Sequence, residues 1–213
     1  MANHVCSVLL RLAVLSVLVV IAAATGCDSG STAGSLDWAS VASSADGTKL
    51  VAAATLGNIY TSTDSGATWT QRTQQGFVGV VSSADGTKLV GVGVDAHSGG
   101  GGIFIYTSSD SGATWTQTTA PQQSWQALAS SADGTKLVAT GLDSAGNGCT
   151  YTSSDSGATW TQTGTKQHWN SVASSSDGTK LVAVSGDLLA PLKIIGGYIY
   201  TSSDSGTTWT QRL

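Results

Sequence analysis

The chain has 213 residues, of which only 10% are charged, and its formal net charge is −4 at pH 7. All 13 acidic residues are Asp, 27 residues are Gly and 2 are Pro, and 40% of the chain is hydrophobic. This balance excludes a basic nucleic-acid-binding surface and argues against wholesale disorder, and the length suits one large all-β domain or two small ones.

Residues 1–26 have the pattern of a secretory signal peptide. An apolar run from Leu12 to Ala24 follows Arg11, and it is shorter than the roughly 20 residues that a membrane span needs. Residues 24–27, Ala-Thr-Gly-Cys, resemble the lipobox of bacterial lipoproteins, in which the cysteine carries the lipid. This resemblance implies that Cys27 is lipidated and that the protein is a lipoprotein anchored to a membrane of the bacterial cell envelope, on the extracytoplasmic side. A plain secretory signal with an incidental Cys27 is the alternative.

Residues 27–35 are rich in Ser and Gly, and we expect them to form a flexible tether between the anchor and a folded part that starts at residue 36. Cys149 is then the only thiol of the folded part. Its strand-like surroundings predict a buried, unreactive side chain.

Two motifs alternate four times after residue 36. The first is Ser-(Ala/Ser)-Asp-Gly-Thr-Lys-Leu, and the second is Tyr-Thr-Ser-(Ser/Thr)-Asp-Ser-Gly-(Ala/Thr)-Thr-Trp-Thr-Gln. The Asp residues of the second motif lie 46, 45 and 49 residues apart, which is the period of a propeller blade. The sequence therefore predicts an all-β fold, a β-propeller of four blades, each a four-stranded antiparallel sheet. The approximate blade boundaries are 36–73, 74–120, 121–165 and 166–213.

Each repeat resolves into four short strands, A to D. In the first repeat we expect strand A at 39–43, strand B at 49–53, strand C around 59–61 and strand D from Thr68 onward. The Asp-Gly pair between strands A and B predicts a two-residue type I′ turn with positive φ at both residues. The B–C loop varies in length and sequence, and the second motif forms the C–D turn.

The second motif closely resembles the Asp-box, or bacterial neuraminidase repeat (BNR), of sialidase-like propellers and photosystem II assembly-factor-like proteins. The resemblance implies a structural C–D hairpin in which Asp accepts hydrogen bonds from turn amides, Gly takes a strained φ and Trp packs between sheets. The residues in these roles are Asp64, Gly66 and Trp69; Asp110, Gly112 and Trp115; Asp155, Gly157 and Trp160; and Asp204, Gly206 and Trp209. Each turn offers one carboxylate, so we expect no metal.

The resemblance to sialidases implies an Arg triad, a Tyr nucleophile activated by Glu, and an Asp acid/base. Without the signal peptide the chain has only Arg72 and Arg212, and it has no Glu at all. The histidines show no zinc-binding spacing either. We therefore expect no enzymatic activity and no cofactor. A divergent glycan-active hydrolase of sialidase-like fold that uses Asp alone is the alternative.

A ligand is expected on the side of the propeller where the B–C and D–A loops emerge. Asp95, Asp143 and Asp187 occupy one equivalent B–C position in the second, third and fourth repeats, and aromatic residues open strand A. Together they suit a sugar or a cationic peptide group. Packing between sheets is the competing interpretation of the aromatic residues, and solvated turns that of the Asp residues. The predicted ligand-face residues are Asp95, His97, Trp125, Asp143, His168, Trp169 and Asp187.

We thus expect a lipid-anchored, non-catalytic binding or scaffold module of the cell envelope. Its partners are the membrane, through the lipid, and an unknown protein or polysaccharide, but no nucleic acid. A surface repeat protein without a ligand is a further alternative. The four repeats are compatible both with a closed monomeric ring and with two chains that form one eight-bladed ring.

Overall fold

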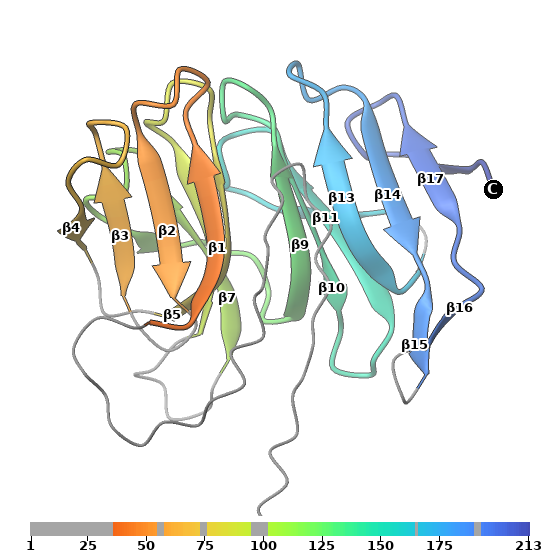
Figure 1. Ribbon diagram of the computed structural model, residues 1–213. Coiled ribbons are helices and arrows are strands. Elements are labelled where there is room, and N and C mark those ends of the chain that lie inside the picture. Colours follow the sequence, from red (N-terminus) through yellow and green to blue (C-terminus); the bar gives the residue numbers. More distant parts are fainter. Residues whose placement is uncertain (1–35, 55–57, 73–75, 95–101, 165, 190–192) are drawn as a thin grey trace, which may run out of the picture.

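The computed structural model describes residues 36–54, 58–72, 76–94, 102–164, 166–189 and 193–213. The predicted signal peptide, Cys27 and the tether lie outside these ranges. Four sheets stand side by side in chain order (Figure 1). No helix long and apolar enough to cross a membrane occurs in the described ranges.

Each sheet is an antiparallel meander of four strands, which confirms the predicted fold class of a four-blade β-propeller. The first blade contains β1 (Trp38–Ser43), β2 (Leu50–Ala54), β3 (Ile59–Ser62) and β4 (Thr70–Gln71). The second contains β5 (Gly76–Ser82), β6 (Leu89–Val94), β7 (Ile103–Ser108) and β8 (Thr116–Gln117). The third contains β9 (Ser124–Ser130), β10 (Leu137–Leu142), β11 (Gly148–Ser153) and β12 (Thr161–Thr163). The fourth contains β13 (Trp169–Ser174), β14 (Leu181–Ser185), β17 (Ile199–Ser202) and β18 (Thr210–Gln211).

The B–C segment of the fourth blade adds a second, smaller sheet. Strands β15 (Asp187–Leu189) and β16 (Lys193–Ile195) pair antiparallel, with Leu188 opposite Ile194. The described backbone of this segment is thus a pair of antiparallel strands outside the four-stranded sheet.

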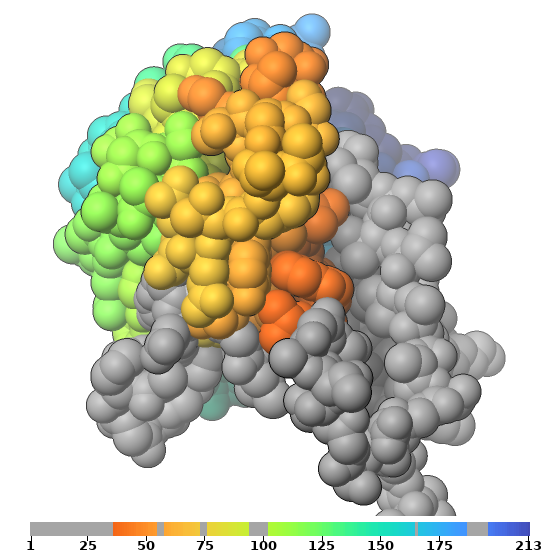
Figure 2. Space-filling view, turned by 60° about the vertical axis from the view of Figure 1, so that its left-hand side comes forward, coloured from red at the N-terminus to blue at the C-terminus, as the bar shows by residue number. Residues whose placement is uncertain are grey.

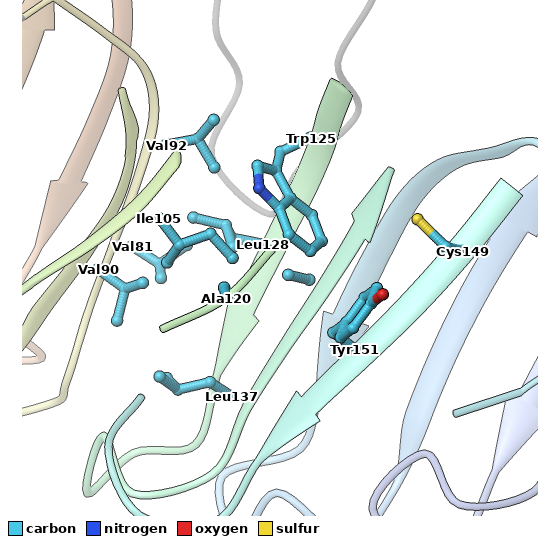
Figure 3. Close-up of a cluster of buried hydrophobic side chains, with 11 residues drawn as sticks. Val81, Val90, Val92, Ile105, Ala120, Trp125, Leu128, Leu137, Cys149 and Tyr151 are labelled. Atoms are coloured by element: carbon cyan, nitrogen blue, oxygen red, sulfur yellow. The ribbon is translucent and has the colours of Figure 1, made fainter. Parts of the chain in front are cut away.

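The core lies between blades, because successive side chains of a strand point to opposite faces of its sheet. In Figure 3, Val81, Val90 and Ile105 of the second blade face Trp125 and Leu128 of the third. Corresponding clusters join the first blade to the second and the third to the fourth. We call the face that is directed toward the preceding blade the front face and the opposite one the back face; in the two inner blades both faces are covered.

The A–B turn differs from the predicted type I′ geometry. The Gly47 amide donates to the Ser44 carbonyl (3.1 Å), so Ala45 and Asp46 are the central residues of a β-turn. Gly47 has a φ of +72°, whereas Asp46 is not among the described residues with positive φ. The Asp46 carboxylate explains the difference, since it accepts hydrogen bonds from the Ser44 hydroxyl (2.6 Å) and the Thr48 amide (3.0 Å) and holds a longer turn.

Consecutive A–B turns are joined by backbone hydrogen bonds. The Ala45 amide donates to Ala84 (2.7 Å), the Ala84 amide to Ala132 (2.6 Å) and the Ala132 amide to Ser176 (2.7 Å). Among the described residues no such bond joins the fourth blade to the first. In Figure 2 the first blade, orange to yellow, lies at the front, and part of the fourth blade, in blue, is seen behind it.

We expect Gly86→Ala to lower the free energy of unfolding by about 2–4 kcal/mol, and Gly146→Ala by about 1 kcal/mol. Both glycines have positive φ, but an added Cβ at Gly86 lies 2.8 Å from the Lys49 Cβ of the preceding blade, whereas Gly146 has nothing within 4 Å. Urea denaturation measures both. Equal losses at the two positions contradict the close approach of neighbouring blades.

Candidate functional site

The C–D turns are built by the Asp carboxylate and two hydroxyls. In the first blade the Asp64 carboxylate accepts from the Thr68 amide (2.9 Å), the Thr68 hydroxyl (2.5 Å) and the Ser62 hydroxyl (2.7 Å). The Ser62 hydroxyl oxygen in turn accepts from the Gly66 amide (2.9 Å). The same bonds recur around Asp110, Asp155 and Asp204.

Two residues of each C–D turn have a left-handed backbone, whereas the sequence pointed only to the glycine. Ser65 has a φ of 59° and Gly66 a φ of 89°, and the other three turns repeat this pair. A positive φ at serine is strained. The dense hydrogen bonding of the turn, with the Ser65 amide also donating to the Thr48 carbonyl (3.0 Å), holds it there.

The Trp residues of these turns pack less deeply than expected. Trp115, Trp160 and Trp209 are half-buried and donate their indole N–H to the carbonyl of the turn glycine at 3.0–3.2 Å. Trp69 is exposed, and so the expectation that it packs between sheets is wrong for the first blade. The reason is that no blade precedes the first one in the described structure.

Hydrogen bonds lower the pKa of the repeated carboxylates. The Thr68 hydroxyl, the Thr68 amide and the Ser62 hydroxyl lower the pKa of Asp64 from 3.8 to about 2. In the A–B turn, the Ser44 hydroxyl and then the Thr48 amide lower the pKa of Asp46 to about 2. The pKa is lowered for the same reason at Asp85, Asp110, Asp133, Asp155, Asp177 and Asp204.

The predicted ligand face is described in part. Asp95 and His97 lie outside the described residues, as does the side chain of Asp187, whose backbone begins β15. The Asp143 carboxylate accepts from the Ala145 amide (2.9 Å), the Asn147 amide (2.8 Å) and the Asn147 side chain (3.1 Å). The Asn147 side chain and amide lower the pKa of Asp143. This carboxylate is therefore part of its own B–C turn.

His168 is exposed and lies against the same turn. Its Nε2 is 2.9 Å from the carbonyl oxygen of Gly146, and an added Cβ at Gly148 would collide with the Gln167 backbone. The structure thus brings His168 of the segment before β13 together with the Asp143 turn of the third blade. These two are the predicted ligand-face residues whose side chains are described and accessible.

The prediction that Trp125 and Trp169 belong to the ligand face is wrong. Both are buried, to 1% and 2% exposure, between the blade that carries them and the one before. Each ring packs edge-on against the Tyr of its own strand C, with Trp125 5.4 Å from Tyr151 and Trp169 5.0 Å from Tyr200. The packing interpretation is therefore the right one, because a ligand in solution cannot reach these buried rings.

A row of buried hydroxyls crosses the third blade, and the sequence analysis missed it. Thr140 pairs with Thr150, which pairs with Thr163, and their hydroxyls have no hydrogen-bond partner within the described protein. The second blade has Val92 and Ile105 where the third has Thr140 and Thr150. An alignment of the four repeats, position by position, reveals this difference between the second and third blades.

Cys149 is buried, as expected. Burial raises the pKa of its thiol to about 11, and the nearby Asp143 charge adds to this shift. The thiol is therefore protonated and a poor nucleophile at neutral pH. Among the described residues, no three His, Cys or Asp side chains gather in the way a metal site requires.

We expect the free energy of unfolding to fall as the pH drops from about 4 toward about 2. The pKa of the turn carboxylates is lower in the folded than in the unfolded chain, so their stabilisation is complete above the ordinary value of 3.8 and is lost through the folded value of about 2. Urea denaturation across this pH range measures it, and the dependence is shallower in Asp64→Asn. A stability that is constant over the range contradicts the assignment.

The comparisons with known proteins show the fold. No family model and no curated protein matches the chain. Among solved structures it is similar to a putative TolB from Agrobacterium tumefaciens, with a TM-score of 0.61 and 17% identity over 83% of this chain and 61% of that one. It is also similar to the Dos1 propeller (TM-score 0.59, 14% identity, 83% of this chain, 48% of that one). A third is the GH74 xyloglucanase from Xanthomonas campestris (TM-score 0.57, 16% identity, 81% of this chain, 29% of that one). The chain spans less than two thirds of each of these structures, and at such identities the likeness is one of fold, that of a β-propeller.

Proposed function

We propose that this chain is a lipid-anchored, extracytoplasmic β-propeller that binds a protein or polysaccharide of the cell envelope and catalyses no reaction itself. The propeller fold alone is compatible with several functions, since the solved structures that it resembles include a TolB and a xyloglucanase. The choice between binding and catalysis therefore rests on the side chains.

The state of the carboxylates supports a binding role. A glycosidase needs a carboxylic acid with a raised pKa as its proton donor. Nine described Asp residues have a lowered pKa instead, because their own turns donate hydrogen bonds to them. Carboxylates in this state stabilise turns and attract cations, but they do not protonate a leaving group at neutral pH.

The B–C side of the blades is the proposed binding surface. Along the sequence, Asp95 comes next after β6, Asp143 next after β10, and Asp187 two residues after β14, so an acidic residue follows the second strand of three successive blades. The exposed His168 lies on the Asp143 turn. An acidic edge of this kind suits basic groups of a peptide or an aminated polysaccharide.

The sequence resemblance to lipoproteins and to Asp-box repeats supports the remaining parts of the proposal. The Ala-Thr-Gly-Cys segment at residues 24–27 is the candidate lipidation signal. The four C–D turns have the self-contained hydrogen bonding that a structural repeat requires. Both observations favour a scaffold that is held at a membrane and presents its loops.

Cys27→Ala is expected to abolish incorporation of radiolabelled palmitate and to move the protein from the membrane fraction to the soluble fraction of the expressing bacterium. Cys149→Ala is the matched control, because it removes a buried thiol and leaves the candidate lipobox intact. Palmitate labelling that survives in Cys27→Ala contradicts the anchor.

The binding role is tested with the full chain in a mild detergent. We expect no turnover of a panel of chromogenic glycosides, and measurable affinity for a basic peptide or for peptidoglycan sacculi. Replacing Asp95, Asp143 and Asp187 together by Asn is expected to lower that affinity at least about tenfold by removing the acidic edge. Turnover of any glycoside, or equal affinity of the triple variant, contradicts the proposal.

A further inference from the structure

The front face of the first blade exposes apolar side chains whose counterparts in the other blades are buried. Trp38 is 49% exposed and Val41 is 44% exposed. The equivalent residues of the second blade, Phe77 and Val80, are buried against the first blade. The first blade thus presents a complete blade-packing face with no blade on it.

The back face of the fourth blade likewise exposes apolar side chains whose counterparts in the first blade are buried. Val182 is 41% exposed, and Val184 and Ile199 are exposed as well. The equivalent residues of the first blade are buried against the second blade: Val51, Ala53 and Ile59. An open hollow of about 500 Å³ lies on this face, and Lys180, Val182, Thr201 and Arg212 are among its lining residues.

These two faces are the halves of an interface that occurs three times within the chain. At each junction a Thr of strand C meets the C–D turn glycine of the next blade, since an added Cβ on that glycine would lie 2.8 Å from the Thr methyl group. The pairs are Thr61 with Gly112, Thr107 with Gly157, and Thr152 with Gly206. A Lys also covers the A–B glycine of the next blade: Lys49 over Gly86, Lys88 over Gly134 and Lys136 over Gly178.

At the two ends of the chain each of these pairs is incomplete. Gly47, the A–B glycine of the first blade, has nothing within 4 Å, and Lys180 of the fourth blade is exposed where Lys49 is half-buried. The three atoms nearest to an added Cβ at Gly66 all belong to Leu50 and Trp69 of its own blade. For each incomplete pair, the residue type that the internal junctions place opposite occurs at the other end of the chain.

We propose that a second copy of this chain covers these faces: the fourth blade of each copy packs on the first blade of the other, and two copies close one ring of eight blades. In this arrangement the Ser176 amide faces the Ala45 carbonyl, Lys180 covers Gly47, and Thr201 meets Gly66 of the other copy. Val182, Val184 and Ile199 then cover Trp38 and Val41. The proposal is independent of the binding role proposed above.

Two observations favour a second copy over other occupants. The junction is already realised three times with one set of residue types, so this chain carries a self-complementary pair of faces. A two-fold axis that coincides with the central axis of the ring makes the two contacts between the copies identical, and it leaves no blade face uncovered.

The first test is a disulfide between the two faces. Within the chain the Ala84 amide donates to the Ala132 carbonyl (2.6 Å), which brings the two backbones together, and we therefore choose these positions for the cysteines. We expect the double variant Ala45→Cys/Ser176→Cys to give, under mild oxidation, a non-reduced gel band at twice the mass of its reduced form. The matched control Ala84→Cys/Ala132→Cys forms its disulfide within one chain and keeps the single mass. A disulfide between residues 45 and 176 of one chain, or no disulfide at all, overturns the proposal.

The second test is the mass of the full chain in detergent by light scattering, with the detergent contribution subtracted. The wild type is expected at two copies and Val182→Asp at one copy, because the new charge is buried only in the assembly. Ser154→Asp adds the same charge to an exposed turn of the third blade and is expected to remain at two copies. Near-ultraviolet circular dichroism confirms that each variant is folded. A monomeric wild type, or a folded Val182→Asp that stays at two copies, overturns the proposal.

Discussion

The apolar side chains of the described core are buried where two neighbouring sheets pack face to face. A single four-stranded sheet has two faces, and each of the two inner blades buries one face on the blade before and the other on the blade after, whereas the first and fourth blades bury one face each. Stability is therefore a property of junctions rather than of blades, as in other repeat proteins. The consequence is visible at both ends of the chain, where residue types that are buried elsewhere meet solvent.

The turns perform a separate task, which is to keep each sheet in register with its neighbours. Every A–B and C–D turn contains an Asp whose carboxylate accepts hydrogen bonds from its own turn, so the turn conformation does not depend on contacts with another blade. Backbone groups of the turn therefore remain available for hydrogen bonds between blades, such as the bond from the Ala45 amide to the Ala84 carbonyl. Rigid turns on one side leave the B–C loops on the other side as the variable part of the molecule.

The period, the strands and the four blades could be predicted because they follow from residue spacing and from alternation along each strand. The conformation of the turns could not, since a side-chain acceptor at Asp46 selects a longer turn than the Asp-Gly pair alone favours. The exposure of Trp69 also escaped prediction, because a repeated motif carries no information on which copy stands at an end. For the same reason Trp125 and Trp169 were assigned both to a ligand face and to packing, and only the position of the preceding blade decides between them.

The one-sided packing of the terminal blades has a bearing on how the folded chain opens. A blade held at a single junction separates from its neighbour at a lower free energy than an inner blade held at two. Local unfolding of the native protein therefore starts at β1–β4 or at β13–β18, and a protease reaches the backbone there first. Any partner that covers these faces adds the missing second junction, so resistance to digestion rises with protein concentration when the partner is another copy of the chain.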